Sequence, residues 1–286
     1  MRLAILIMAH HQPKQLAILC KSLQHPKIDI FIHIDKHANN IDFISAIKEY
    51  KYKLISKSIP VKWGGFSIVQ SIINSYQEIL ASGTYDYICN ISGQDLPIQP
   101  LDNLLEFLSM HKGDEFIENI PSNSEHPWWI ENSIRVKKFS FINLNFPGKY
   151  RLENIINKIT PERSLKNNYI FSGNSGWFCL TSNAVEWIIA TYKQDSSYNR
   201  FFKYVWGADE IYFSTILYNS FFRSKMKGNL VFTQWNTLNR LHPQLLTLDT
   251  FDELIQSKMF FARKFDLASD SQIIIEIVNH ISKNNK

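Results

Sequence analysis

The segment Leu3-Ala4-Ile5-Leu6-Ile7-Met8-Ala9 is an unbroken apolar run near the start of the chain. A short apolar run without polar alternation is typical of a strand that is covered on both faces. The polar turn His10-His11-Gln12 follows it, and then a helical pattern over residues 14–23, with Pro13 suited to the first helical position. Strand, turn and helix in this order predict the first unit of an α/β fold.

The same alternation continues through the first third of the chain. Further strands are expected at 28–35, 52–56 and 87–91, and helices at 41–50 and 66–82. Right-handed crossovers between such elements predict a Rossmann-like, mainly parallel central sheet flanked by helices. Ligands of these sheets bind at the carboxyl ends of the strands. Three polar turns are expected there, at residues 10–12, 35–37 and 92–95.

The second half of the chain is less regular. Residues 121–168 are rich in Asn, Ser and Pro, which predicts a substrate-facing loop region over the sheet. Regular structure is expected again as a strand at 177–181 and as helices at 183–191, 211–218 and 269–282. No linker or repeat marks a boundary, so we expect a single domain over residues 1–286.

Composition narrows the class of protein. A chain of 286 residues with 45% hydrophobic residues can bury a substantial core. Its net charge of +5 is modest and mostly dispersed, which argues against a nucleic-acid partner. No apolar run is long enough to span a bilayer, and the first segment does not have the pattern of a signal peptide. Cys20, Cys89 and Cys179 lie in apolar contexts, as buried thiols in a reducing compartment do.

Two adjacent carboxylates open the helix expected at 211–218, in the segment Trp206-Gly207-Ala208-Asp209-Glu210. Acidic residues are favoured in the first turn of any helix, because they meet free N–H groups and the positive end of the helix dipole. A carboxylate in this position is also a candidate general base. We interpret Asp209 as the helix cap and Glu210 as the base.

Phosphate binding would have to depend on side chains, since the sequence has neither G-x-G-x-x-G nor a P-loop motif. Arg240 and Lys264 are the candidates. Lys264 is set among Phe260, Phe261 and Phe265, which would draw its charge into a partly dry site, although a lysine that snorkels to water is the alternative. Asp35 ends the second strand and is either a contact to a ribose or base, or an ordinary turn residue.

Several short motifs occur together in a specific order: Ile32-His33-Ile34-Asp35-Lys36, Trp63-Gly64-Gly65-Phe66-Ser67, Ser92-Gly93-Gln94-Asp95-Leu96-Pro97-Ile98, Ser175-Gly176-Trp177-Phe178, Ala208-Asp209-Glu210 and residues 260–266. In this order and spacing the chain resembles the core 2 / I-branching β-1,6-N-acetylglucosaminyltransferase family. That family also includes the peptide O-xylosyltransferases. The chain is most similar to compact bacterial members.

The resemblance implies a GT-A type glycosyltransferase fold, an inverting mechanism and independence of a divalent metal or other cofactor. It makes Glu210 the catalytic base, and it places Asp35, Asp95, Arg240 and Lys264 at the donor. Position 93 is Gly, where α/β sugar-nucleotide transferases often have the first carboxylate of an Asp-X-Asp metal motif, and one carboxylate fixes a divalent ion poorly.

The resemblance and the aromatic residues also indicate an acceptor side. Glu118 and Lys137 match an acidic residue and a basic cluster near the acceptor sugar, and Trp235 is a candidate for stacking on a sugar ring. We therefore expect a nucleotide-sugar-binding half at 1–120 and an acceptor-binding and catalytic half at 121–286.

The expected reaction is transfer of a sugar from a UDP-sugar, in the first instance GlcNAc, to a glycan hydroxyl during bacterial surface polysaccharide synthesis. The alternatives are a UDP-xylose-dependent xylosyltransferase and an inactive carbohydrate-binding protein on the same fold. The expected acceptor is a glycan or a lipid-linked oligosaccharide. The expected location is the cytoplasm, with scope for peripheral association at the inner face of the bacterial membrane.

Overall fold

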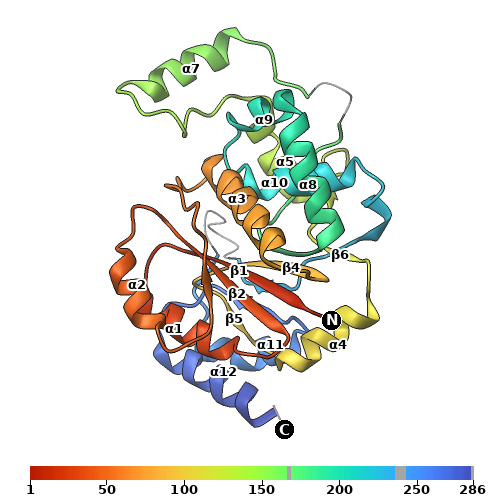
Figure 1. Cartoon of the computed structure of the whole chain (residues 1–286). Helices are drawn as coiled ribbons and strands as arrows, with labels where there is room; N and C mark the ends of the chain where they lie inside the picture. Colours follow the sequence, from red (N-terminus) through yellow and green to blue (C-terminus); the bar gives the residue numbers. More distant parts are fainter. Residues whose placement is uncertain (166–168, 236–242, 285–286) are drawn as a thin grey trace. The chain divides into compact units, whose positions relative to one another are not determined.

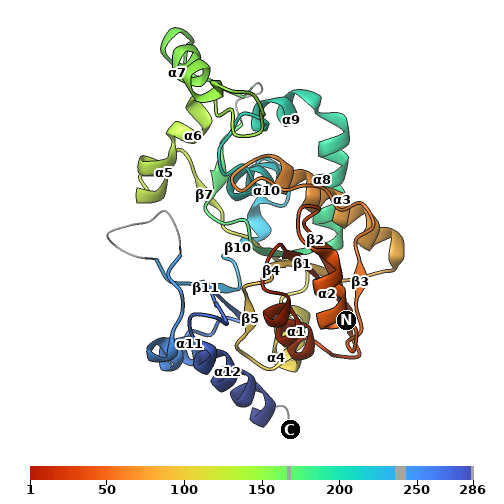
Figure 2. The same ribbon diagram turned by 90° about the vertical axis from the view of Figure 1, so that its left-hand side faces the viewer.

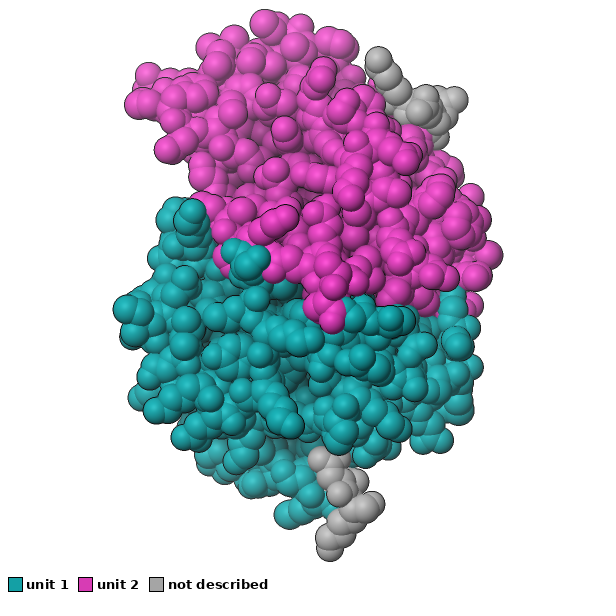
Figure 3. All heavy atoms as spheres, in the orientation of Figure 1, with its two compact units in different colours: residues 1–56, 83–113, 230–286 teal, residues 57–82, 114–229 magenta. Residues whose placement is uncertain are grey.

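A computed structural model describes residues 1–165, 169–235 and 243–284. The chain forms two compact units, each built from separate segments (Figure 3). Unit 1 comprises Met1–Ser56, Gly83–Gly113 and Leu230–Lys286, and unit 2 comprises Lys57–Ser82 and Asp114–Asn229. The expected halves, nucleotide-sugar-binding at 1–120 and acceptor-binding and catalytic at 121–286, are defined by what they bind. They stay a prediction.

Unit 1 contains a parallel sheet with the strand order β4-β1-β2-β3 (Figure 1). The strands are β1 (Leu3–Ala9), β2 (Ile28–Ile34), β3 (Lys53–Leu54) and β4 (Tyr87–Ser92). Residues Leu3 to Ile7 of the central strand β1 have no exposed surface, as expected for a strand covered on both faces. The predicted mainly parallel α/β sheet is confirmed.

The helices of unit 1 are α1 (Pro13–Ser22), α2 (Asn40–Ile47), α4 (Leu101–Met110), α11 (Phe251–Gln256) and α12 (Ser271–Asn284). Helix α1 begins at Pro13, as predicted. A second sheet has the order β11-β12-β5, from β11 (Val231–Thr233), β12 (Phe261–Arg263) and β5 (Leu96–Pro97). Because β12 pairs antiparallel with β5, the segment after residue 260 lies next to the segment that follows β4.

Unit 2 contains a sheet of β10 (Met226–Lys227), β6 (Glu115–Phe116) and β9 (Phe178–Thr181), in that order. It also contains an antiparallel pair of β7 (Ile120–Pro121) and β8 (Ser172–Gly173). Its helices include α3 (Ser67–Ser82), α8 (Ser182–Gln194), α9 (Ser196–Phe202) and α10 (Asp209–Tyr218). Residues 211–218 of α10 are all buried, so this helix is apolar on every side and forms the centre of the unit.

The loop region predicted at 121–168 is wrong. This segment contains α5 (Pro127–Asn132), α6 (Ile134–Lys137) and α7 (Lys149–Ile159), which Figure 2 shows as separate helices. The dense Asn, Ser and Pro residues obscured the helical spacing of the apolar ones. In addition, α7 has no buried residue, so it does not carry the core-facing stripe by which helices are recognised.

Candidate active site

Three polar turns of unit 1 lie where the parallel strands β4, β1 and β2 end, at one edge of the sheet. The electrostatic neighbours of their side chains confirm that they gather there. His10 interacts electrostatically with Asp35 and Lys264, and Lys264 interacts in the same way with Asp95. Residues from three strand ends and from the segment after β12 therefore form one charged cluster, which we call the donor-side cluster.

Asp95 is the buried anchor of the donor-side cluster. Its side chain has no exposed surface, and its carboxylate accepts hydrogen bonds from Ser92 N at 2.9 Å and Ser92 Oγ at 2.5 Å. Arg263 Nε donates to the same carboxylate at 3.1 Å. Burial raises the pKa of Asp95, while the Arg263 guanidinium and the Ser92 donors oppose that rise. Asp95 thus fixes Arg263, and the direct donor contact expected of it stays a prediction.

Lys264 follows Arg263 and is half-buried between Phe261 and Phe265, which are fully buried in the core. Desolvation lowers the pKa of Lys264, and the neighbouring Arg263 charge lowers it further, while Asp266 and Asp95 oppose both effects. Lys264 thus has intermediate burial next to two buried rings, and its role toward a phosphate stays a prediction. An ammonium held in this way is available for an anion.

The backbone around Lys264 is held by two glutamines that follow β1. Gln15 is fully buried and donates through Nε2 to Phe265 O at 3.0 Å, and its Oε1 accepts from Leu267 N at 2.8 Å. Gln12 Nε2 donates to Asp266 Oδ2 at 2.7 Å. These two glutamine contacts were not among the predictions from the sequence. The polar residue Gln15 in an otherwise apolar stripe of a helix was the available signal.

Asp35 is buried to 8% exposure at the end of β2, and its Oδ1 accepts from His37 N at 2.7 Å. This hydrogen bond is the turn contact that was one of the two expectations for Asp35. His10 and His11 stack with ring centroids 4.2 Å apart, and burial lowers the pKa of both. The lowered pKa values favour the neutral forms of both imidazoles.

In unit 2, Glu210 lies in the first turn of α10 and is paired with Arg135 of α6. Arg135 NH1 donates to Glu210 Oε2 at 2.5 Å, and the two side chains are 17% and 30% exposed respectively. The carboxylate therefore has one oriented partner and also a surface that a substrate can reach. A base needs both properties, because it must be aimed and must touch the hydroxyl group that it deprotonates.

Aromatic rings surround this ion pair. The Arg135 guanidinium lies over Trp206 at 4.3 Å and over Trp128 at 5.7 Å from the ring centroids. Trp63, which is 60% exposed, meets Trp206 edge-on with 5.2 Å between the centroids. Such rings hold the guanidinium by cation–π attraction and offer apolar faces to a sugar. We call Glu210, Arg135 and the three tryptophans the base-side cluster.

Two glycines make room for the base-side cluster. Gly64 and Gly207 both have positive φ, at 71° and 65°, and Gly207 N donates to Gly64 O at 2.8 Å. A Cβ at Gly64 would lie 2.8 Å from Trp206 Nε1, and one at Gly207 would lie 2.9 Å from Arg135 NH1. Side chains at either position would therefore displace the ring or the guanidinium.

The capping role predicted for Asp209 is wrong. The N-cap of α10 is Ala208, and Asp209 is the first residue of the helix itself. Its carboxylate lies against Gly176, where a Cβ would approach Asp209 Oδ2 to 2.7 Å. The segment Ser175-Gly176-Trp177 thus makes room for the Asp209 side chain. The other carboxylate of this turn, Glu210, pairs with Arg135.

A family model described as "Core-2/I-Branching enzyme" matches residues 3–257. The chain belongs to the Core-2/I-Branching enzyme family. Together with the parallel α/β architecture, this confirms the resemblance and the GT-A type of fold that it implied.

Curated relatives of this Core-2/I-Branching chain include Xylosyltransferase 2 of Rattus norvegicus, 25% identical over 307 residues that cover 97% of this chain and 33% of the relative. Xylosyltransferase 1 of Mus musculus is 23% identical over 309 residues, which cover 99% of this chain and 31% of the relative. The chain thus spans about a third of the length of these relatives.

Solved structures with a similar arrangement include mouse xyloside xylosyltransferase 1 in its apo form, at a TM-score of 0.41 and 12% identity, covering 91% of this chain and 96% of that one. The galactosyltransferase LgtC with donor and acceptor sugar analogs has a TM-score of 0.45 at 9% identity, covering 96% of this chain and 95% of that one. Such scores are too low to transfer any feature of those structures to this family member.

The remaining predicted residues of this Core-2/I-Branching chain differ in setting. Glu118 is half-buried beyond β6, and its Oε1 accepts weakly from Asn229 N at 3.5 Å. Lys137 pairs with Glu162 at 3.3 Å on the surface, and Trp235 is 45% exposed. Their acceptor roles stay predictions. Arg240 lies outside the described residues. Arg135, two residues before Lys137, is the member of the basic cluster that contacts Glu210.

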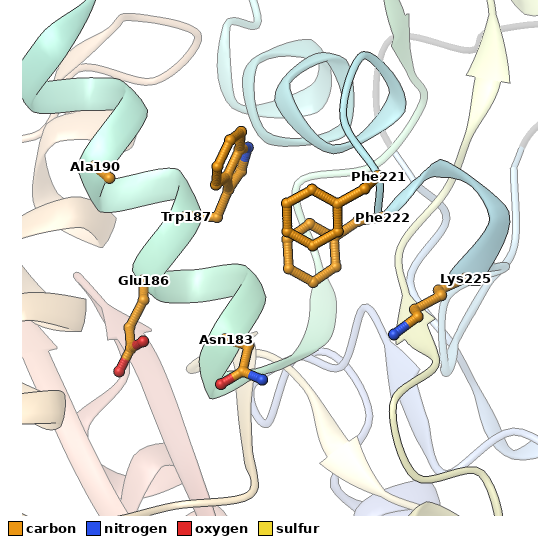
Figure 4. A pocket seen from close by; sticks show the side chains of 7 residues that line it. All are labelled: Asn183, Glu186, Trp187, Ala190, Phe221, Phe222 and Lys225. Atoms are coloured by element: carbon orange, nitrogen blue, oxygen red, sulfur yellow. The ribbon is translucent and has the colours of Figure 1, made fainter.

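No group of three His, Cys, Asp or Glu side chains suited to a metal ion occurs within the described residues. A pocket of about 430 Å³ lies elsewhere in unit 2, between α8 and the segment after α10. Figure 4 shows Trp187 facing Phe221 and Phe222 across it. Neither the donor-side nor the base-side cluster contributes to its lining.

Proposed function

We propose that the chain is an inverting glycosyltransferase that moves a sugar from a UDP-sugar to a hydroxyl group of a glycan. The observation that carries the proposal is the Glu210–Arg135 pair. Its carboxylate is partly exposed, and it is oriented by a guanidinium that lies over tryptophan rings. Family membership supports it. Binding alone has no need for an oriented base, so the inactive carbohydrate-binding alternative is less well supported.

In this mechanism Glu210 accepts the proton of the attacking hydroxyl group. The oxygen of that group forms a bond to the anomeric carbon while the bond to the UDP oxygen breaks, and the configuration of the anomeric centre inverts in this single displacement. Arg135 holds the Glu210 carboxylate in place throughout. The tryptophan faces provide the apolar contact that positions a sugar ring.

The leaving UDP acquires negative charge that must be neutralised. We assign this task to Lys264 and Arg240, without a divalent metal. Two observations support the assignment of Lys264: its ammonium is held half-buried in the donor-side cluster, and the adjacent Asp95 is already bound to Ser92 and Arg263. A carboxylate engaged by these donors is a poor metal ligand. Asp35, at the same edge, is proposed to contact the nucleoside.

Two donor sugars are proposed, each for a specific reason. The family resemblance favours UDP-GlcNAc, whereas the names of the relatives, Xylosyltransferase 2 and Xylosyltransferase 1, favour UDP-xylose. Glu118, Lys137 and Trp235 are proposed to contact the acceptor. We further propose that the acceptor is a glycan or lipid-linked oligosaccharide of a bacterial surface polysaccharide, and that transfer takes place at the inner face of the membrane. Within the described ranges, no helix has both the length and the hydropathy to cross a bilayer.

The test is a panel of UDP-sugars incubated with the purified chain in EDTA, with release of UDP as the readout. Hydrolysis or transfer with one donor, and inversion shown by NMR of the product, would support the proposal. Activity that requires manganese would overturn the metal-free mechanism. Binding of a UDP-sugar without any turnover, under conditions that include glycan acceptors, would favour the inactive carbohydrate-binding protein.

A further inference from the structure

Helix α7 contacts the protein through a row of polar residues and leaves a row of apolar residues exposed. Lys149, Glu153 and Asn157 recur at every fourth position and so share one face. Leu152, Ile155 and Ile159, at the spacing i, i+3 and i+7, form the other face and are 42%, 56% and 76% exposed. This arrangement is the reverse of a helix that packs on a core.

The polar face of α7 is firmly attached to residues 138–144 of the same unit. Asn157 Oδ1 accepts from Phe139 N at 2.7 Å and its Nδ2 donates to Phe139 O at 2.8 Å. Glu153 Oε2 accepts from Phe141 N, and Lys149 Nζ donates to Leu144 O at 2.9 Å. These contacts from three successive turns fix the rotation of the helix, so its apolar row is directed outward by the structure.

Cations flank the apolar row. Arg151 and Lys158 are exposed next to it, and neither forms an ion pair with any residue that the structure describes. Both views show α7 at one end of the segment that also contains α5 and α6 (Figures 1 and 2). An exposed apolar stripe bordered by unpaired cations is the pattern of a helix that lies in the interface of an anionic bilayer.

We propose that the α7 face formed by Leu152, Ile155 and Ile159, with Arg151 and Lys158, docks the protein on an anionic lipid surface. A second copy of the chain fits this face less well. An antiparallel pair of α7 helices would bring Arg151 of one copy near Lys158 of the other, and so place like charges together. Three short side chains also bury much less than the roughly 800 Å² per partner of a stable interface. An anionic surface instead satisfies both the cations and the apolar row.

The experiment is co-sedimentation of the full chain with vesicles of phosphatidylcholine alone and of phosphatidylcholine with phosphatidylglycerol. We expect binding to the anionic vesicles that weakens as salt is raised. The triple variant Leu152→Gln, Ile155→Gln, Ile159→Gln should lower the affinity at least about tenfold. The matched control replaces three isoleucines exposed on unit 1, Ile41, Ile44 and Ile275, by Gln and should bind as the wild type does.

A second variant, Arg151→Gln with Lys158→Gln, keeps the apolar row and should remove most of the salt dependence. Equal binding to neutral and anionic vesicles, or unchanged binding of the triple variant, would overturn the proposal. So would a wild-type dimer in light scattering that the triple variant converts to a monomer, since the face would then belong to a second copy. UDP release from a soluble donor without vesicles tests the proposed function separately, because lipid docking does not require turnover.

Discussion

The donor-side cluster and the base-side cluster each hold a carboxylate paired with an arginine, and these two pairs differ in their access to water. In unit 1, Asp95 is fully buried and Arg263 is 15% exposed. In unit 2, Glu210 is 30% exposed and Arg135 is 17% exposed. The buried carboxylate holds its arginine in place, and the partly exposed carboxylate also presents a surface to solvent. We therefore expect the pair in unit 1 to act mainly by positioning and the pair in unit 2 to act in the chemistry, while a direct donor contact by Asp95 stays a prediction.

The largest expected effect concerns Glu210. Glu210→Gln keeps the shape of the side chain and removes the base, so turnover should fall by about 100- to 10,000-fold. Calorimetry should show donor affinity close to that of the wild type, and thermal melting should show a loss of stability below about 1 kcal/mol, because the pair is partly solvated.

The control for this variant is Glu186→Gln, which changes an exposed carboxylate of the same unit outside the base-side cluster. Initial rates of UDP release distinguish the two. Wild-type turnover in Glu210→Gln would reject the assignment of the base, and with it the comparison between the two pairs.

For Asp95 we expect the opposite pattern, in which the main effect of a substitution is on stability. Asp95→Asn removes the charge that compensates the buried Arg263 guanidinium, and breaking a buried pair from one side costs about 3 to 5 kcal/mol. For a chain of this size the melting temperature should fall by roughly 6 to 15 °C. If the variant melted like the wild type but lost donor binding, Asp95 would be a direct ligand and not a structural anchor.

Glu115 extends the comparison to a buried carboxylate that pairs with no arginine among the described residues. It accepts hydrogen bonds from Thr181 N at 2.8 Å and Thr181 Oγ1 at 2.6 Å. Burial raises the pKa of Glu115 from 4.5 to about 7. The folded chain therefore keeps a proton that the unfolded chain releases above pH 4.5. This contribution to stability is complete below pH 4.5 and is lost as the pH rises to about 7.

The contribution of Glu115 amounts to at most about 3 kcal/mol, from the size of the pKa rise. Glu115→Gln imitates the protonated acid, so its melting temperature should change less between pH 5 and pH 8 than that of the wild type. Denaturation with urea at both pH values measures the difference. Parallel pH profiles for the variant and the wild type would contradict the raised pKa.

The smallest effect is expected at Lys264, whose half-exposed charge is screened by water. Lys264→Ala should weaken binding of UDP by roughly tenfold, as the loss of one charge-assisted contact predicts. Calorimetry in EDTA is the measurement, and Lys258→Ala, on the preceding loop of the same unit, is the control. Unchanged affinity in Lys264→Ala would remove this residue from the donor site.

The sequence by itself determined the sheet and the order of the polar turns. Continuous apolar runs such as Leu3 to Ala9 indicate buried strands, because a strand that is covered on both faces is mostly apolar. Once three such strands are parallel neighbours, the turns after them must meet at one edge. The burial of Lys264 was likewise predictable, since its aromatic neighbours belong to the core.

The tertiary structure alone decided which charged groups are partners. Arg135 lies 75 residues from Glu210 in sequence, and Arg263 lies 168 residues from Asp95. No local pattern distinguishes Arg135 from its neighbour Lys137, because the choice depends on the rotation of α6 beside Trp206. Periodicity reports which face of an element is apolar, and only the packed chain decides whether that face is turned inward, as in α3, or outward, as in α7.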